Sequence, residues 1–275
     1  MTWGSVRGSV VAASVEWTKV CAQPKTIALL VACAVAPLIF VTAIQIQAAV
    51  PSDTLVGRMV HESGFATPLV VLGFAGLWVL PVMAGLAGGD QFSSEDRHGT
   101  WATLLTRSRS RGEIYAGKIL VSFALAILAL AVLAGSAMAA GAIVVGTQPL
   151  IDLSGALVPP AAAVERIVLA WASVLPAYLA FTAAAILCSI ATRSSIGGVG
   201  LPAMAGLAMQ LAGAFDAPPW ARDLLLTTGF ESWHGLFAEP AFTRPLLDSA
   251  IVSVVYAAVC LAVAHRIFRR RDVAA

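Results

Sequence analysis

Long uncharged stretches dominate the chain, and short groups of charged residues separate them. Six such stretches cover residues 26–52, 63–89, 119–151, 167–192, 194–215 and 249–265. A charged side chain near the centre of a bilayer costs at least about 2.5–3.5 kcal/mol, so gaps between charges mark membrane spans. A helix needs about 20 apolar residues to cross, which the first five stretches exceed and the last approaches with about 17. The pattern predicts an all-α integral membrane protein with six transmembrane helices in one domain, residues 1–275.

The first 25 residues follow a different pattern. Apolar residues recur at helical spacing, with Glu16 and Lys19 largely on the opposite side, until Pro24 ends the run. This predicts an amphipathic helix within residues 1–25 that lies in the headgroup plane, with Trp17 at the interface. The first uncharged stretch begins after Lys25 and is longer than the ~7–15 apolar residues of a cleavable signal, so we expect a retained span.

Residues 216–248 combine charged and aromatic residues, among them Trp220, Phe230 and Trp233. A polar extracellular domain would not be so aromatic. Short helices that dip into the outer leaflet fit this mixture. We therefore predict a re-entrant extracellular segment between the fifth and sixth spans.

Composition supports a membrane protein. Hydrophobic residues make up 59% of the chain and charged residues 12%, with a mean hydropathy of +0.87. A soluble domain is about 25% charged, so the chain has too few charges to cover a surface in water. The four cysteines and four histidines show no spacing typical of a disulfide framework or a metal site, and we expect neither.

The distribution of Lys and Arg predicts orientation. If both termini are cytoplasmic, only four of the 17 basic residues face outward: Arg58, Arg166, Arg222 and Arg244. Positive charge favours the cytoplasmic side, so we expect both termini there. Arg is preferred to Lys by 14 to 3, and Ala and Gly are abundant, which suggests a GC-rich bacterial genome and hence the bacterial inner membrane.

A charged loop in residues 88–118 separates the second and third predicted spans. From Asp90 to Lys118 it holds nine of the 32 charged residues. Trp101, Leu104 and Leu105 follow its first charges at helical spacing, so a short helix there would present an apolar knob to a groove of a partner. A solvated, positively charged inner loop explains the charges equally well.

The end of this loop resembles a phosphate-binding loop. Residues 112–118 run from Gly112 to Gly117-Lys118, but Ile119 stands where a Ser or Thr would hold magnesium. No strand precedes it, and a predicted span follows. We therefore expect any ATP to bind another subunit.

The loop also resembles a known family. The pattern Glu-x-x-x-Gly-Thr-x-x-x-Leu-Leu-Thr, followed by Arg and Gly-Lys, is similar to the cytoplasmic loop of ABC-2 type transporter permeases, in the same place after the second of six helices. Its residues here are Glu95, Gly99, Thr100, Leu104, Leu105, Thr106, Arg111, Gly117 and Lys118. The layout of the whole chain is similar too. That family often has Pro-x-Ser-Arg before Gly-Lys, where this chain has Arg107-Ser-Arg109-Ser-Arg111.

The resemblance implies that ATP binding and passage through the membrane are carried out by different subunits. Glu95 to Leu105 would form a coupling helix that docks on a separate ABC ATPase subunit, which binds ATP and magnesium; this chain would bind no cofactor and carry no catalytic residues. Glu16 and Trp17 would lie on the connecting helix beside it. The implied docking residues are Glu95, Arg97, His98, Gly99, Thr100, Trp101, Leu104, Leu105 and Arg111. Other implied partners are a second permease copy or homologue and membrane lipids, with no nucleic acid.

We expect the chain to be the permease subunit of an exporter of an amphiphilic, drug-like or lipid-like substrate. A permease-like subunit of a sensor or maturation system is the alternative, and a stand-alone carrier or membrane enzyme a weaker one, because no carboxylate lies deep in a span. The polar residues in or beside the spans have two interpretations, a translocation path or interhelical hydrogen bonds, of which we favour the second. They are Gln45, Tyr178, Thr182 and Gln210.

Overall fold

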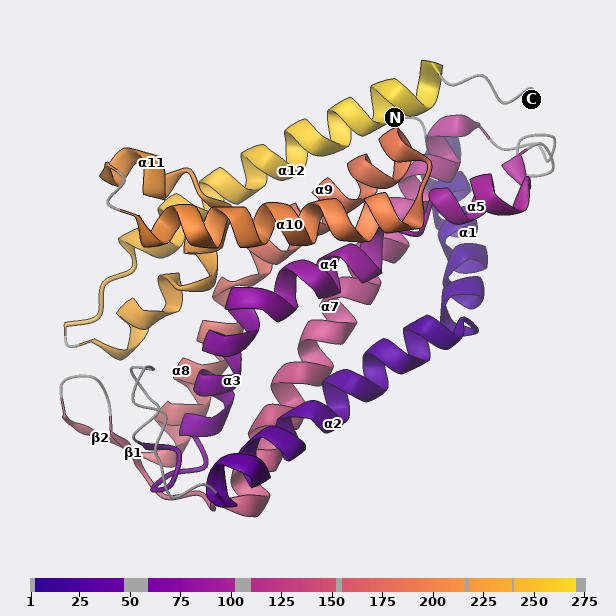
Figure 1. The fold of residues 1–275 in the computed structure, drawn as a ribbon. Coiled ribbons are helices and arrows are strands. Elements are labelled where there is room, and N and C mark those ends of the chain that lie inside the picture. Colours follow the sequence, from indigo (N-terminus) through magenta and orange to yellow (C-terminus); the bar gives the residue numbers. More distant parts are fainter. Residues whose placement is uncertain are drawn as a thin grey trace.

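The computed structural model describes residues 3–46, 59–101, 110–151, 155–215, 218–238 and 240–270. Nearly all of this part of the chain is helical, and the long helices run roughly side by side (Figure 1). A two-stranded antiparallel hairpin, β1 (Leu150–Ile151) and β2 (Leu157–Val158), lies at one end of the bundle. The sequence pattern did not predict this hairpin.

The six predicted spans are confirmed as helices long and apolar enough to cross a membrane. The second span is built from α3, the π-helical turn η2 and α4, and the fourth from α8 and α9. Their bounds are α2 Pro24–Ile46, α3 Ala66–Phe74, η2 Ala75–Val79, α4 Leu80–Gly88, α7 Arg111–Val144, α8 Pro160–Ser173, α9 Leu175–Thr192, α10 Ser195–Ala214 and α12 Arg244–Arg270.

Proline can kink a helix within a span, and two of the four prolines Pro37, Pro81, Pro176 and Pro202 stand at breaks in helices. Pro81 follows η2 in the first turn of α4, and Pro176 follows the break between α8 and α9. Proline lacks a backbone N–H. It is tolerated in the first turn of a helix, where an N–H would have no helical partner in any case. Pro37 and Pro202 instead lie within uninterrupted helices, α2 and α10.

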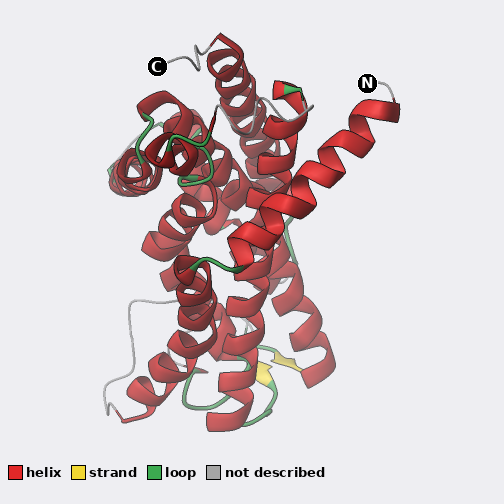
Figure 2. Cartoon of the chain, turned by 90° about the vertical axis from the view of Figure 1, so that its right-hand side faces the viewer, coloured by secondary structure: helices red, strands yellow, loops and turns green. Residues whose placement is uncertain are grey.

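The two ends of the bundle differ in what they contain. The described chain begins and ends at one of them, where α5 (Ser93–His98) and the start of α7 also lie; we call it the α5 end (Figure 1). The opposite end carries the hairpin, and we call it the hairpin end. The N-terminal helix α1 (Trp3–Cys21) runs obliquely across the bundle and packs against α7 (Figure 2).

The segment predicted to re-enter the outer leaflet forms short helices at the hairpin end. They are α11 (Pro219–Asp223) and the 3-10 helices η3 (Leu226–Phe230) and η4 (Ser232–Phe237). Phe230 and Trp233 are buried against the bundle, whereas Trp220 is exposed. The placement of residues 216–248 in the outer leaflet stays a prediction.

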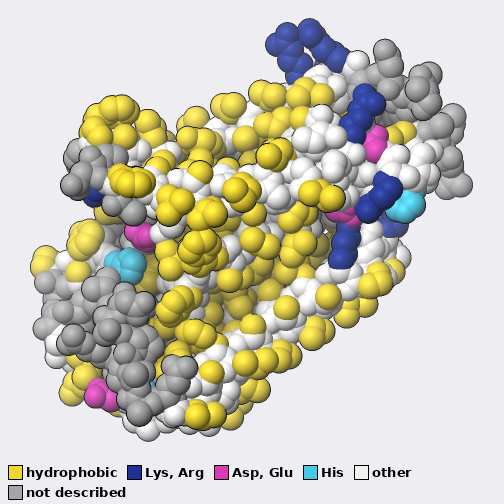
Figure 3. All heavy atoms as spheres, in the orientation of Figure 1, with side chains coloured by type: hydrophobic (Ala, Val, Ile, Leu, Met, Phe, Trp, Pro, Cys, Tyr) yellow, Lys and Arg dark blue, Asp and Glu magenta, His cyan; other side chains and the backbone are white. Residues whose placement is uncertain are grey.

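Apolar side chains cover much of the outer surface, while the Lys and Arg in view gather mainly at the α5 end (Figure 3). Exposed apolar residues include Met204 of α10 and Val254 and Val259 of α12. Inside, α9 packs against α4, α10 and α12, and α7 packs against α1 and α2. A surface that is apolar along the helices and charged at one end suits a bilayer.

Candidate functional site at the α5 end

The helix α5 is short because the chain reverses directly after it. It ends at His98, and Gly99 follows with a φ of 64°, a left-handed conformation that costs glycine little. Gly99 and Thr100 donate their N–H groups back to carbonyls of Asp96 and Glu95. A continuous helix from Glu95 to Leu105 therefore does not form, although residues 102–109 lie outside the described part of the chain.

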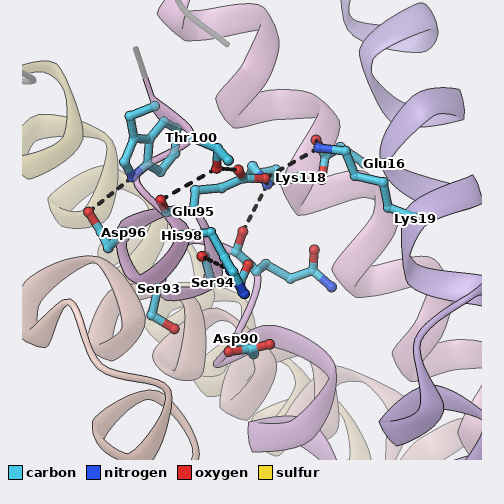
Figure 4. A network of polar contacts seen from close by, with 12 residues as sticks. Glu16, Lys19, Asp90, Ser93, Ser94, Glu95, Asp96, His98, Thr100 and Lys118 are labelled. Atoms are coloured by element: carbon cyan, nitrogen blue, oxygen red, sulfur yellow. Dashed lines mark hydrogen bonds and ion pairs between the residues drawn. The ribbon is translucent and has the colours of Figure 1, made fainter. Parts of the chain in front are cut away.

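A buried lysine joins three helices at this site. Lys118 of α7 is only 1% exposed, and its Nζ lies 2.9 Å from Glu16 Oε2 of α1 and 3.1 Å from Glu95 Oε1 of α5. It also donates to the Gln91 carbonyl at 2.9 Å. Lys19 of α1 completes the set, 3.1 Å from Glu16 and 3.4 Å from Glu95 (Figure 4). These four residues, which we call the ion network, have two positive and two negative charges.

The ion network explains how charged residues are tolerated in the interior. Taking an ion out of water costs several kcal/mol, which is offset only where good geometry and further hydrogen bonds satisfy the group. Lys118 has three acceptors for its three N–H donors, and Thr100 Oγ1 donates to Glu95 Oε2. Removing Lys118 would leave Glu16 and Glu95 without their buried cation, so the network makes the relative positions of α1, α5 and α7 depend on one another.

The charges in the network shift the pKa of two members. Burial raises the pKa of Glu95, but Lys118, the Thr100 hydroxyl and Lys19 outweigh it and hold that pKa below its ordinary value of 4.5. Burial lowers the pKa of Lys19, but Glu16 and Glu95 outweigh it and raise the pKa above 10.5. Glu95 and Lys19 are therefore both charged at neutral pH.

A second polar cluster ties α10 to the same end. Asp90, which precedes α5, accepts from Arg97 Nη2 at 2.8 Å, and also pairs with Lys25 of α2 and the Ser195 hydroxyl of α10. Arg97 also donates to Ser195 Oγ at 3.1 Å, and the Ser93 hydroxyl lies 3.0 Å from the same atom. Residues 90–101, which contain α5 and which we call the α5 segment, are therefore hydrogen-bonded to α1, α2, α7 and α10.

An aromatic cluster connects α5 to the last helix. The Trp101 ring is buried against Phe92 and Phe268, with ring centroids at 6.3 and 5.3 Å. Phe268 of α12 also packs on Phe92 and on Tyr115 of α7, at 5.5 and 6.0 Å. Trp101 Nε1 donates to Asp96 Oδ1 at 3.0 Å. Trp101, expected to face a partner, is thus buried within this chain, and its role as an anchor for a partner stays a prediction.

The start of α7 is fixed by its own cap and by close packing. Ser110 and Glu113 form a capping box, in which each side chain accepts from the other residue's N–H. A Cβ at Gly117 would lie 2.9 Å from Ala12 Cβ, so only glycine lets α1 approach α7 this closely. Arg111, an implied docking residue, donates to the Arg269 carbonyl of α12 at 3.3 Å.

Part of the α5 segment remains open to solvent. Arg97, His98 and Gly99 are exposed, and beside them lies a pocket of about 400 Å³ lined by residues of α5, of the turn after α9 and of the start of α10. Arg193 in that turn is also exposed and is left-handed, with a φ of 54°. The pocket residues are Ser93, Asp96, Arg97, Arg193, Ser194, Ser195 and Ile196.

Residues 12–208 match the family model described as ABC-2 family transporter protein. This match covers more than half of the chain, including the whole α5 segment. The chain belongs to the ABC-2 transporter family. A search of curated proteins gave no match. The protein is therefore a transmembrane permease of an ABC transporter, and family membership implies a partnership with an ABC ATPase subunit.

The structure of the ABC-2 permease separates the four polar residues considered for a path. Tyr178 and Thr182 are buried on α9, where Thr182 donates to the Tyr178 carbonyl at 3.0 Å. Gln45 bonds to the Val60 carbonyl and to His61, and Gln210 bonds to Glu231 at the hairpin end. They do not share one surface. The Thr182 bond lies within α9, and the bonds of Gln45 and Gln210 link their helices to turn residues rather than to other helices. The Tyr178 hydroxyl has no hydrogen-bond partner among the described residues, and the choice between a path and interhelical bonds stays a prediction.

The family resemblance implied that Glu16 lies on a helix beside the segment of Glu95, but the sequence pattern did not predict what joins the two carboxylates in the ABC-2 permease. Lys118 was treated as the last residue of a false phosphate-binding loop, yet its ammonium holds both carboxylates. A lysine next to a long apolar run, in a loop motif with glutamate, was the available signal. Asp90 and Phe268 had no such signal, because their partners are distant in sequence.

No group of three or more His, Cys, Asp or Glu side chains suited to a metal was found in the described residues of the ABC-2 permease. The four charges of the network are satisfied by one another, by the Gln91 carbonyl and by Thr100. The site thus holds α1, α5 and α7 together, and Arg97, His98 and Gly99 beside it are exposed.

Proposed function

We propose that this permease docks an ABC ATPase subunit at the α5 end and transmits ATP-driven closure of that subunit to its helices for export. The observation that carries this proposal is the ion network, in which Lys118 pairs with both Glu16 and Glu95. A displacement of α5 would strain buried ion pairs to α1 and α7. These elements would therefore move together as a rigid body.

In this proposal the docking surface consists of the exposed residues of α5 and of the pocket beside them. Arg97 and His98 supply positive or polar contacts, and the neighbouring pocket admits a side chain of the ATPase. Leu104 and Leu105 remain the proposed apolar anchors, although they lie outside the described residues. ATP and magnesium bind the ATPase subunit, and this end of the permease faces the cytoplasm.

The proposed assembly contains two permeases, either two copies or a copy and a homologue, with two ATPases. Export of an amphiphile is favoured because the bilayer-facing surface is apolar and the carboxylates of the described spans, Glu113, Glu165 and Asp248, lie near the starts of their helices rather than deep in a span. A sensor or maturation complex would use the same docking and differ in having no soluble cargo.

The partner ABC ATPase subunit provides the test. Replacing both anchors, Leu104→Ala with Leu105→Ala, should abolish its co-purification with the permease and leave membrane insertion intact, because apolar anchors in a groove dominate binding. Leu120→Ala, at an exposed leucine of α7, is the matched control and should retain the ATPase. Unchanged co-purification and transport in the double variant would contradict the docking assignment.

A further inference from the structure

We propose that the hairpin end binds the zwitterionic headgroup of an amphiphile, with a positively charged amine and a phosphate or carboxylate on one small headgroup. The site is a pocket between α10, α11 and η3. That the bound amphiphile is cargo rests on the proposed function, whereas the binding itself does not.

The pocket has the size of a small-molecule site. Its volume is about 330 Å³, at the lower end of the range of about 300–1,000 Å³ typical of ligand pockets. Part of the space exists because Gly213 has no side chain: a Cβ there would meet only Leu225 Cδ1, at 3.7 Å. The lining residues are Gln210, Gly213, Arg222, Leu225, Thr227, Thr228 and Glu231.

Groups of opposite charge line this pocket from different elements. Arg222 of α11 donates from Nη2 to the Phe215 carbonyl at 3.0 Å, which positions the guanidinium. Glu231, after η3, accepts from Gln210 Nε2 of α10 at 3.2 Å. A guanidinium favours phosphate or carboxylate, and a carboxylate favours an ammonium. A headgroup with both charges matches the pocket better than a purely anionic one.

The surroundings suit an amphiphile rather than a free zwitterion. The same end of α10 exposes Leu211 and Phe215, which offer apolar surface to an alkyl chain. Trp220 of α11 is 68% exposed, as expected of an aromatic residue at the level of lipid headgroups. Polar groups in the pocket and apolar groups along the helix thus match the two parts of a lipid-like molecule.

A neighbouring pocket is a weaker candidate. It has a volume of about 380 Å³ and shares Thr228. Its charged residues are Asp223 of α11 and the exposed pair Arg244 and Asp248, 3.6 Å apart on α12. Two carboxylates and one guanidinium match a cation better than a zwitterion. The pocket of Arg222 and Glu231, which has one charge of each sign, is therefore the one to test.

Native mass spectrometry of the purified permease can measure the binding of short-chain phosphatidylethanolamine and of phosphatidylglycerol with the same chains. We expect phosphatidylethanolamine to bind more tightly, and Glu231→Gln to weaken its binding about tenfold while phosphatidylglycerol is unaffected, because only the former has an ammonium. Arg222→Gln should weaken both. Glu165→Gln, at an exposed carboxylate of α8, is the matched control and should change neither.

A second pair of variants tests whether binding needs the open volume of the pocket, as distinct from its charges. Gly213→Leu should fill the pocket and abolish the preference for phosphatidylethanolamine, whereas Gly200→Leu, on the same helix in open space, should retain it. Glycerophosphoethanolamine, which lacks the chains, should compete only weakly. Equal binding of both lipids, or wild-type binding by Glu231→Gln and Gly213→Leu, would overturn the proposal. The permease is assayed alone, so a failure of ATPase docking would not affect this result.

Discussion

The two ends of the bundle use charge in opposite ways. At the α5 end, Lys118, Glu16 and Glu95 are buried and paired, so their charges hold helices together. At the hairpin end, Arg222 and Glu231 are exposed residues that line a pocket. Buried pairs fix geometry because breaking one is costly, whereas exposed charges contribute little to stability. We therefore propose that the buried charges of the first end connect helices mechanically and that the exposed charges of the second recognise a ligand.

The largest expected difference between the ends is in stability. Lys118→Met leaves two buried carboxylates with only the more exposed Lys19 as a cation and should destabilise the permease by about 3–5 kcal/mol. Glu231→Gln removes an exposed charge at the other end and should cost less than about 1 kcal/mol. Thermal unfolding of the detergent-solubilised permease measures both.

Lys19→Met is the control within the network, because Lys19 contacts the same two carboxylates but is far more exposed than Lys118. Its effect should be close to that of Glu231→Gln. Equal melting temperatures for Lys118→Met and Lys19→Met would show that burial of the cation does not matter, and the contrast between the ends would then fail.

A smaller difference is expected between the wild type and Glu95→Gln in how the melting temperature depends on pH. The pKa of Glu95 lies below 4.5 in the fold, so its contribution is fully present above about pH 4.5 and is lost as the pH falls through the lower, folded pKa. The melting temperature of the wild type should therefore drop in that acid range more steeply than that of Glu95→Gln. Parallel melting curves against pH would contradict the ion pairing of Glu95.

The sequence pattern predicted the long helices better than the contacts between them. Gaps between charges located six spans because charge is costly in a bilayer. They misplaced the start of the third, since Lys118 lies inside α7 where paired carboxylates satisfy it. The break in the predicted coupling helix was harder to foresee, because the left-handed turn at Gly99 depends on local hydrogen bonds.

Partners in the site could be predicted only where a motif linked them. Glu16 and Glu95 came from the resemblance to the family, and they meet in the structure. Trp101 was expected on the surface because three apolar residues follow a charged run. Its burial depends on Phe268, more than 160 residues later in the chain, and helical periodicity carries no information about such a contact.

Site-specific photo-crosslinking tests the proposed docking most directly. A photoreactive residue would replace His98, exposed on α5, or Leu157, exposed on the hairpin at the opposite end, in the permease co-expressed with its partner ABC ATPase. We predict a permease–ATPase product from position 98, increased when ATP holds the ATPases closed, and none from position 157. A product from position 157 alone, or none from either position in a complex that co-purifies, would contradict docking at the α5 end.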